Sequence, residues 1–412
     1  AMLQYQDAGK VVQRELMTAY YRDLEEGEGP VAYLFVPGNV VEILRAFDIR
    51  AVFPEINALQ CGVKRTAEAN ILRAEDIGYS ADVCGYVKND IGICLARGET
   101  PLGRIPKPDA LVCNFSGCNT FIKWFEALVD FYDAPMFLLD VPYSRGEETQ
   151  AQDREYVTAQ LWDLVAWCED LTGTSFSEAK LREALKHSRE AEDLWTELLA
   201  LAGRRPSPFD AYFEAVFFMA PINVLRGTPE CVDYYRVVLQ EMEERVEAGV
   251  GPVPEEKFRV IYEGPPCWPH FRSFWELFKP WGVVGVASTY SKVGGLFDQG
   301  IRHDPARPME SIADYVINCY TNWNLGMRAD LLHRYVQEYE ADALIIHSVK
   351  SCRSFSVGQP DFRETFTHDL GIPTLMIESD LADPRYFSEA QLRNRVDAFF
   401  ESLEHRRLVR AA

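Results

Sequence analysis

The part of the sequence that decides the fold is residues 343–360, which read ALIIHSVKSCRSFSVGQP. The first five residues, Ala343 to His347, form the short apolar run that is typical of a fully buried strand. Pro360 then predicts a helix that covers about residues 361–369. Cys352 is therefore expected between the carboxyl end of a strand and a helix start. Ligands bind there in open α/β sheets, and helix N-terminal amides favour negative charge such as a thiolate.

The same alternation of strands and helices extends outward from this segment. Short apolar runs predict three further strands in the last part of the chain, at 258–262, 283–287 and 374–377. Similar runs predict five strands in the first part, at 31–36, 51–53, 81–84, 109–113 and 135–141. Because short links and helices separate these strands, parallel, doubly wound sheets are expected.

The middle of the chain has a different pattern. From Thr149 to about Gly249 the apolar spacing is helical almost throughout. The fold is therefore predicted to be α/β, with two doubly wound parallel-sheet domains joined by a helical connector. The expected boundaries are 1–148 for an N-terminal helix plus the first α/β domain, 149–252 for the connector and 253–412 for the second α/β domain.

Composition and charge exclude several classes of protein. The 412 residues are 47% hydrophobic, which is ample for two cores, and their net charge of −21 argues against a nucleic-acid surface. No apolar run has membrane-spanning length, and the N-terminus lacks the features of a signal peptide. Ten cysteines without a C-x-x-C pair indicate reduced thiols. A soluble cytoplasmic protein that binds neither nucleic acid nor membrane is expected.

Three cysteines share one predicted environment. Cys84, Cys118 and Cys352 each lie where a predicted strand meets a helix, two in the first α/β domain and one in the second. If the carboxyl edges of the two sheets face each other, the three thiolates converge in the cleft between the domains. Three cysteines suit an iron–sulfur cube that keeps one iron for another ligand. The alternative is that they are small buried hydrophobic residues, like the remaining seven.

Glu55 and His347 are the candidate acid/base residues, because each lies near the carboxyl end of a predicted strand. Desolvation in such a cleft raises the pKa of a carboxyl group, which suits proton transfer. The alternatives are a capping or salt-bridged glutamate and a hydrogen-bonded core histidine. Four aromatic residues that neighbour the site in sequence are expected to form its apolar walls: Phe115, Trp268, Phe297 and Phe355.

Two nucleotide-binding motifs are absent from the sequence. It contains no G-x-x-x-x-G-K-[ST], and no G-x-G-x-x-G follows a predicted strand. Neither an ATPase site nor a dinucleotide site is therefore predicted in this chain.

Six motifs together resemble the 2-hydroxyacyl-CoA dehydratase/benzoyl-CoA reductase family. They are DVCGYVK at 82–88, SGC at 116–118 with FIKWFE at 121–126, YEGPP at 262–266, YSKVGGL at 290–296, SVKSC at 348–352 and DLADPRYF at 380–387. The likeness extends over nearly the whole chain. Segments 263–274 and 290–304 look most like the B-type subunits of ATP-dependent benzoyl-CoA reductases.

The resemblance implies a 4Fe–4S cluster bound by Cys84, Cys118 and Cys352, with Glu55 at the position of an acidic residue near it. The implied chemistry is a low-potential one-electron transfer to an aromatic acyl-CoA thioester, which gives a ketyl-type radical. The implied partners are a homologous cluster-bearing subunit, in a heterodimer, and separate ATP-hydrolysing activator subunits.

Three functions remain open at this point. The first is a subunit of an ATP-dependent benzoyl-CoA reductase, which forms a cyclic dienoyl-CoA. The second is the α-type subunit of an (R)-2-hydroxyacyl-CoA dehydratase, which forms an enoyl-CoA by the same radical chemistry. The third is a subunit that only relays electrons or supports a partner that holds the substrate.

Overall fold

Two parallel four-stranded sheets organise the molecule in a computed structural model that describes residues 7–146 and 148–411. The first has the order β2-β1-β5-β6, with the bounds Arg50–Val52, Val31–Leu34, Ala110–Asn114 and Met136–Leu139. The second has the order β10-β9-β7-β8, with the bounds Thr374–Ser379, Ala343–Val349, Phe258–Glu263 and Val283–Ser288. The strands β3 (Glu99–Thr100) and β4 (Gly103–Arg104) form a small antiparallel pair that is not part of either four-stranded sheet. The predicted α/β class with two parallel sheets is confirmed.

Strand burial follows position in the sheets. β9 lies between β7 and β10 and is buried along its whole length, which explains its continuous apolar run. β6 pairs only with β5 among the described strands, and its Leu138 is 42% exposed. The prediction of a buried strand at 135–141 was therefore wrong about burial, because β6 is an edge strand.

The helices of the first part differ from the prediction in one region. Their bounds are Ala8–Glu26 (α1), Val41–Ala46 (α2), Pro54–Val63 (α3), Ala67–Asp76 (α4), Gly85–Leu95 (α5) and Asn119–Tyr132 (α6). No strand exists at 81–84 in the described chain; residues 77–84 are a partly exposed loop between α4 and α5. Segment 81–84 has no neighbouring strand to pair with. The buried Lys88 ammonium instead holds the loop by donating to the Ala81 carbonyl oxygen, at 2.8 Å.

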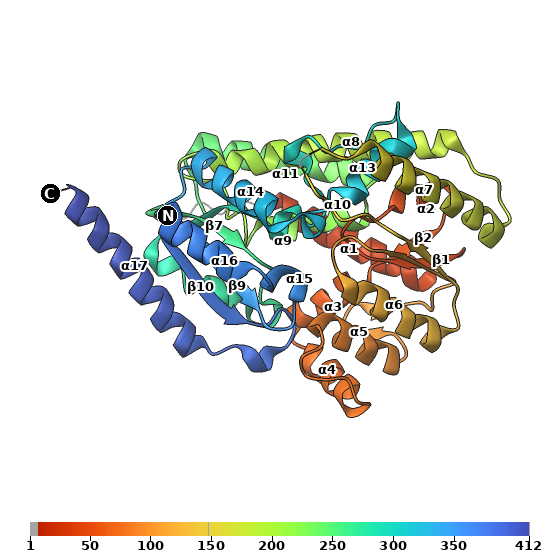
Figure 1. The fold of residues 1–412 in the computed structure, drawn as a ribbon, viewed down its shortest axis with the longest axis horizontal. Helices are drawn as coiled ribbons and strands as arrows, with labels where there is room; N and C mark the ends of the chain where they lie inside the picture. The colour runs from red at the N-terminus through yellow and green to blue at the C-terminus, as the bar shows by residue number, and fades with distance from the viewer. Residues whose placement is uncertain (1–6, 147, 412) are drawn as a thin grey trace.

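The middle of the chain is helical, as predicted. It contains α7 (Ala151–Thr172), α8 (Glu178–Ala200), α9 (Ala215–Phe218), α10 (Ala220–Val224) and α11 (Pro229–Ala248). The Ser177 and Thr228 side chains accept first-turn backbone N–H groups and thereby cap α8 and α11. Helices α8 and α11 run beside each other along one edge of the molecule and extend over both α/β halves (Figure 1).

The last part completes the second α/β half. Its helices are α12 (Phe271–Trp275), α13 (Pro308–Ile317), α14 (Leu325–Glu338), α15 (Arg353–Ser356), α16 (Gln359–Glu364) and α17 (Glu389–Ala411). Short 3-10 turns occur at Leu201–Gly203, Trp268–His270, Lys279–Trp281, Tyr290–Lys292, Phe297–Gln299, Tyr320–Asn322 and Pro384–Tyr386, and a π-helical turn at Thr365–Asp369. Helix α17 extends away from the other helices at the C-terminal end (Figure 1).

One segment of the last part packs against the helical middle and the first half. Helix α13 lies on α7, and Arg154 of α7 donates to Asp314 of α13 at 2.7 Å. Ser144 and Trp323 then form an isolated parallel bridge. The predicted domain boundaries remain a prediction, but residues 308–323 contact the first half although they follow position 253.

Both sheets reverse their strand order at an inner position. In the first sheet the reversal lies between β1 and β5, and in the second between β7 and β9. A loop crevice forms beyond the carboxyl ends of the strands at such a point. Among the helices of the described ranges, none is long and apolar enough to cross a membrane.

Candidate functional site

A small cavity lies where the carboxyl edges of the two sheets face each other. Its volume is about 70 Å³, several times the roughly 10–15 Å³ that one water needs. Seven strands are each followed by a residue that lines it: Pro37 after β1, Glu55 after β2, Cys118 after β5, Pro265 after β7, Tyr290 after β8, Cys352 after β9 and Leu381 after β10. Each sheet has an order reversal with a crevice beyond its carboxyl edge, and residues that follow strands of both sheets line this one cavity.

The structure brings Cys84, Cys118 and Cys352 together around this cavity. Each is the residue that precedes a helix: Cys84 precedes α5, Cys118 precedes α6 and Cys352 precedes α15. Cys118 and Cys352 also follow strands, as expected, whereas Cys84 follows the loop after α4. The position at a helix start was thus predicted for all three, but the strand before Cys84 was not correct.

Hydrogen bonds join the loops that carry the three cysteines. The Gly85 backbone N–H, next to Cys84, donates to the Ser351 hydroxyl oxygen at 3.0 Å. The Ser354 hydroxyl donates to the Gly117 carbonyl oxygen, next to Cys118, at 3.1 Å. Segments separated by more than 200 residues are therefore fixed relative to one another by groups adjacent to the thiols.

Gly117 permits a close approach between the two halves at this site. Its φ is +81°, in the left-handed region that favours glycine, and a Cβ there would lie 1.8 Å from the Thr321 carbonyl oxygen. The Thr321 hydroxyl in turn donates to the Ser116 carbonyl oxygen at 2.7 Å. The turn before Cys118 thus depends on a residue without a side chain.

Burial determines the ionisation of the three thiols. It raises the pKa of Cys84 well above the ordinary range, and the neighbouring Cys352 and Cys118 act in the same direction. Burial also raises the pKa of Cys118, and it raises that of Cys352 to about 12. The first-turn backbone amides of each helix oppose this effect. The thiols therefore hold their protons until a cation replaces them, so metal binding would release protons.

Three cysteine thiols that line one cavity are the type of donor that the predicted iron–sulfur cluster requires. Across the described ranges, no three His, Cys, Asp or Glu side chains converge tightly enough to ligate one ion. The three cysteines instead surround a cavity, from three separate loops. In a cluster each thiolate binds a different iron. Thiols on different sides of a cavity are therefore the arrangement that a cluster requires.

Glu55 is the carboxyl group of the cavity. It lies in the first turn of α3, behind Pro54, and the Val36 backbone N–H donates to its Oε2 at 2.6 Å. Burial raises the pKa of Glu55 to about 7, and the Val36 hydrogen bond opposes the shift. The predicted desolvation is therefore present, and the group is poised to exchange a proton near neutral pH.

His347 does not line the cavity. It is buried within β9, and its ring nitrogens bond to the Pro265 carbonyl oxygen and to the Ser379 hydroxyl. Burial lowers the pKa of His347 to about 4. This geometry corresponds to a hydrogen-bonded core histidine, the alternative that the sequence left open. The expectation that His347 faces the site with Glu55 is corrected here, because its ring points into the strand packing.

The cavity walls are mostly residues that the sequence did not indicate. Of the four expected aromatic residues only Phe355 lines the cavity; Phe121, Trp124, Tyr86 and Tyr290 do so as well. Phe115 and Phe297 lie elsewhere, and Phe297 stacks on Tyr315. Trp268 lies behind the wall, where its indole N–H donates to the Tyr86 hydroxyl.

Two tyrosine hydroxyls form the polar part of the wall. The Tyr86 and Tyr290 oxygens are 3.2 Å apart, and Glu55 influences both groups electrostatically. Burial raises the pKa of each tyrosine, so both remain neutral phenols. Both belong to segments that carry the family resemblance, DVCGYVK and YSKVGGL, which was the available signal for them.

Cys113 and Cys267 lie outside the cavity. Both are fully buried, and burial raises the pKa of each to about 12. Neither lines the site, although Cys113 is only five residues from Cys118. They match Cys84, Cys118 and Cys352 in chemistry but not in position.

Comparisons with known proteins point to one family. The family model described as "2-hydroxyglutaryl-CoA dehydratase, D-component" matches residues 35–403. The B-type subunit of the benzoyl-CoA reductase of Thauera aromatica is 43% identical over 97% of this chain and 96% of its own length. The (R)-phenyllactyl-CoA dehydratase alpha subunit of Clostridium sporogenes is 32% identical over 87% of this chain and 86% of its own. The (R)-2-hydroxyisocaproyl-CoA dehydratase alpha subunit of Clostridioides difficile is 27% identical over 89% and 88%.

Proposed function

The chain belongs to the 2-hydroxyglutaryl-CoA dehydratase D-component family, and from this premise we propose that it is the iron–sulfur subunit of an ATP-dependent benzoyl-CoA reductase. The observation that carries the proposal is the shared cavity of Cys84, Cys118, Cys352 and Glu55. The 43% identity to a benzoyl-CoA reductase subunit, over almost the full length of both chains, supports the reductase over other activities in the family.

In this proposal Cys84, Cys118 and Cys352 hold a 4Fe–4S cluster, which supplies electrons of low potential when bound. The overall reaction adds two electrons and two protons to an aromatic acyl-CoA and yields a cyclic dienoyl-CoA. Separate ATP-hydrolysing activator subunits provide the electrons, and a homologous cluster-bearing subunit is the partner of this chain.

The residues of this chain manage the proton and exclude water. Glu55, with its pKa near 7, holds a proton in about half of the molecules at neutral pH, and its carboxyl oxygen can deliver that proton to the substrate. Tyr86 and Tyr290 remain neutral donors beside it. Phe121, Phe355 and the other apolar wall residues keep the cavity dry, which protects a strongly reducing intermediate from protonation by solvent.

The family model and the phenyllactyl-CoA relative favour one second candidate, the α-type subunit of an (R)-2-hydroxyacyl-CoA dehydratase. Anaerobic purification with the partner and activator subunits, followed by product analysis, separates the two. Formation of a cyclic dienoyl-CoA from benzoyl-CoA is the expected result. An enoyl-CoA from a 2-hydroxyacyl-CoA, without ring reduction, would replace the reductase by the dehydratase. No turnover of either substrate would favour an electron-relaying subunit.

A further inference from the structure

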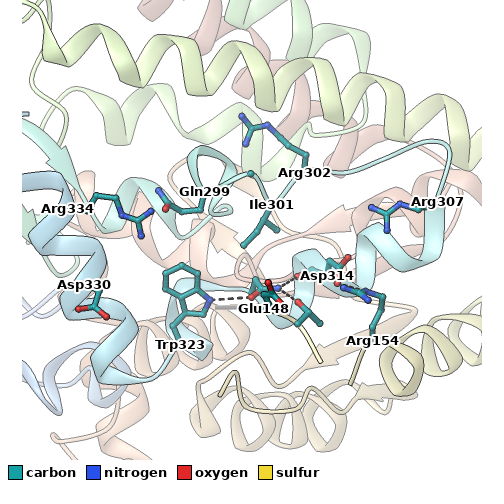
Figure 2. A pocket seen from close by; sticks show the side chains of 13 residues that line it. Glu148, Arg154, Gln299, Ile301, Arg302, Arg307, Asp314, Trp323, Asp330 and Arg334 are labelled. Carbon is teal, nitrogen blue, oxygen red and sulfur yellow. Dashed lines mark hydrogen bonds and ion pairs between the residues drawn. The ribbon is translucent and has the colours of Figure 1, made fainter. Parts of the chain in front are cut away.

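The ion pairs of this chain differ in how much solvent reaches them. Arg154 and Asp314 pair in the large cleft that Figure 2 shows, and their side chains are 33% and 21% exposed. The side chains of Arg328 and Glu263 are 3% and 0% exposed, and the Arg328 Nη2 lies 2.7 Å from the Glu263 Oε1. Water screens the charges of the first pair, whereas those of the second act on their surroundings with little screening.

The Glu263–Arg328 pair connects several segments of the second α/β half. Glu263 is the last residue of β7, and Arg328 lies near the start of α14. Glu263 also accepts hydrogen bonds from the hydroxyl groups of Thr289, after β8, and Tyr320. An ionised carboxylate only accepts hydrogen bonds, so these three donors match a charged Glu263.

Arg328 contacts the segment that carries Cys352. Its Nη1 donates to the Ser354 carbonyl oxygen at 3.1 Å, and its guanidinium carbon lies 5.5 Å from the centre of the Phe355 ring. Ser354 and Phe355 both line the cavity of the three cysteines. Arg328 therefore fixes the chain two and three residues after Cys352.

The charge of Arg328 acts on the cavity against acidic groups. Burial raises the pKa of Cys352 to about 12; the Asp380 charge acts in the same direction, and the Arg328 charge acts in the opposite one. Glu55 acts on Cys118 in the same sense as Asp380 acts on Cys352. The field of Arg328 thus reaches one of the thiols that the proposed cluster requires.

A charge near a redox group changes how readily that group accepts an electron. In the proposed function, one electron from the activator subunits adds one negative charge to the cluster. A nearby cation therefore favours the reduced form, and a nearby carboxylate opposes it. Stability alone does not require a buried ion pair here, because apolar residues of similar volume are often equally stable.

We propose that the Glu263–Arg328 pair sets the reduction potential of the cluster. Arg328 is a positioning residue on the Cys352 segment whose charge favours the reduced form, and Glu263 limits this effect. The inference rests on the cluster of the proposed function. It explains why a complete ion pair is buried directly behind the apolar wall of the cavity.

Anaerobic redox titration of the full chain with its cluster, followed by EPR, tests the two charges. At the wild-type midpoint potential, we expect Arg328→Met to lower the ratio of reduced to oxidised cluster about tenfold, which is about 59 mV for one electron. Glu263→Gln should raise the ratio by a similar factor. The uncharged Glu263→Gln/Arg328→Met double variant should lie within about threefold of the wild type. Both single substitutions remove the same ion pair, so a purely structural role would not give shifts of opposite sign.

Two further variants separate charge from packing. Glu256→Gln is the matched control, because Glu256 pairs with Arg259 at 2.6 Å, equally out of solvent, but near the start of β7 rather than at its end. Neither residue lines the cavity, and the potential should not change. Arg328→Lys keeps the charge and should keep the ratio within about threefold of the wild type.

Shifts of the same sign in Arg328→Met and Glu263→Gln would overturn the inference, as would unchanged potentials in both or an equal shift in Glu256→Gln. If Arg328→Met loses its iron, Glu263→Gln and the double variant still decide, because they differ only at residue 328. Loss of iron from every variant at positions 263 and 328 would show a structural role and overturn it as well. A wild-type chain without a reduced-cluster signal would contradict the proposed function, whereas a wild-type signal that ignores both charges would remove only this inference.

Discussion

Glu55 combines two conditions that an acid catalyst needs, a pKa near 7 and a position on the cavity wall. We expect Glu55→Gln to lower turnover by about 10²-fold or more, with iron content and acyl-CoA affinity retained, because glutamine preserves the Val36 hydrogen bond but carries no acidic proton. Activity of the wild type should fall as pH rises through about 7, where the carboxyl group loses its proton. Steady-state kinetics on both sides of this pH provide the measurement.

A control for this variant is Asp90→Asn. Burial raises the pKa of Asp90 to about 7 as well, but Asp90 accepts the Trp124 indole N–H and does not line the cavity. It should therefore retain turnover. Equal activity of Glu55→Gln and the wild type would exclude Glu55 as an essential acid.

The cysteines allow a matched comparison of five variants. Cys84→Ala, Cys118→Ala and Cys352→Ala should each lose most of the bound iron and the EPR signal of the reduced cluster, because each removes one thiolate ligand. Cys113→Ala and Cys267→Ala, which change fully buried thiols outside the cavity, should retain both. A normal iron content in any of the first three would remove that residue from the ligand set.

The sequence indicated Glu55 and the three cysteines because strand ends and helix starts are local signals. It did not indicate the Tyr86–Tyr290 contact, which joins residues 204 positions apart. His347 shows that a correct strand position does not predict where a side chain points. Its place at the end of an apolar run was correct, but the bonds to Pro265 and Ser379 depend on packing that no local pattern encodes.

At the scale of elements, the turn before α6 holds the two halves together. Gly117→Ala should lower the free energy of unfolding by about 3 kcal/mol or more, since it adds left-handed strain to a clash with the Thr321 carbonyl. Gly173, at the end of α7, also has a positive φ, +66°, but no described atom lies within 4 Å of the position that a Cβ would take. Gly173→Ala should therefore cost only about 1–2 kcal/mol. Urea unfolding of both variants measures the difference, and equal midpoints would contradict the close approach.

The elements themselves were predictable where burial is uniform. β7, β8 and β9 are buried along their whole lengths and appear within a few residues of their expected positions. The edge strand β10 also lies close to its expected position, although it is only partly buried. The segment at 81–84 was misassigned because an apolar residue beside a cysteine resembles a strand end. Only the three-dimensional structure shows that it has no sheet to join and that Lys88 fixes it instead.

At the scale of the whole molecule, the proposed function requires separate subunits that hydrolyse ATP and supply electrons to this chain. The chain contains no phosphate-binding loop motif, so we expect the purified chain alone neither to hydrolyse ATP nor to reduce acyl-CoA. Addition of the partner and activator subunits should restore both activities. ATP turnover by the single chain at a rate comparable to the full complex would contradict this, and a phosphate-release assay on each combination of subunits decides it.

The relative placement of the two sheets could not be predicted from the sequence. It depends on contacts such as the Ser144–Trp323 bridge and the Thr321–Ser116 hydrogen bond, which join part of the last third of the chain to the first half. Alternating strands and helices predict that two sheets exist, but not that both order reversals face one cavity. The site therefore follows from tertiary contacts between halves rather than from either half alone.

Stability of the whole chain should decrease as pH rises from about 4.5 to 7. Burial raises the pKa of Glu55, Asp90 and Asp210 to about 7 each, so in this window the folded chain holds protons that the unfolded chain has released. Each such group contributes a slope of about 1.4 kcal/mol per pH unit. Asp90→Asn should therefore make the slope shallower by about that amount, since asparagine still accepts the Trp124 indole N–H.

His347, whose pKa burial lowers to about 4, opposes this trend as one group against three, because below about pH 6.5 the unfolded chain binds a proton there that the folded chain does not. Carboxyl groups with lowered pKa values do not cancel the trend. The Arg385 and Lys88 side chains hold the pKa of Glu75 at about 2, so its contribution is lost only as pH falls below about 4.5, outside the window. Urea unfolding of the metal-free chain at several pH values between about 5 and 7 measures the slope. Parallel stability curves for the wild type and Asp90→Asn would show that Asp90 does not hold its proton in the folded chain. A difference between the stability curves of the wild type and Asp90→Asn that is confined to this window would instead show that the buried Asp90 carboxyl group holds the proton. Surface carboxyl groups are already ionised in this window in both the folded and the unfolded chain.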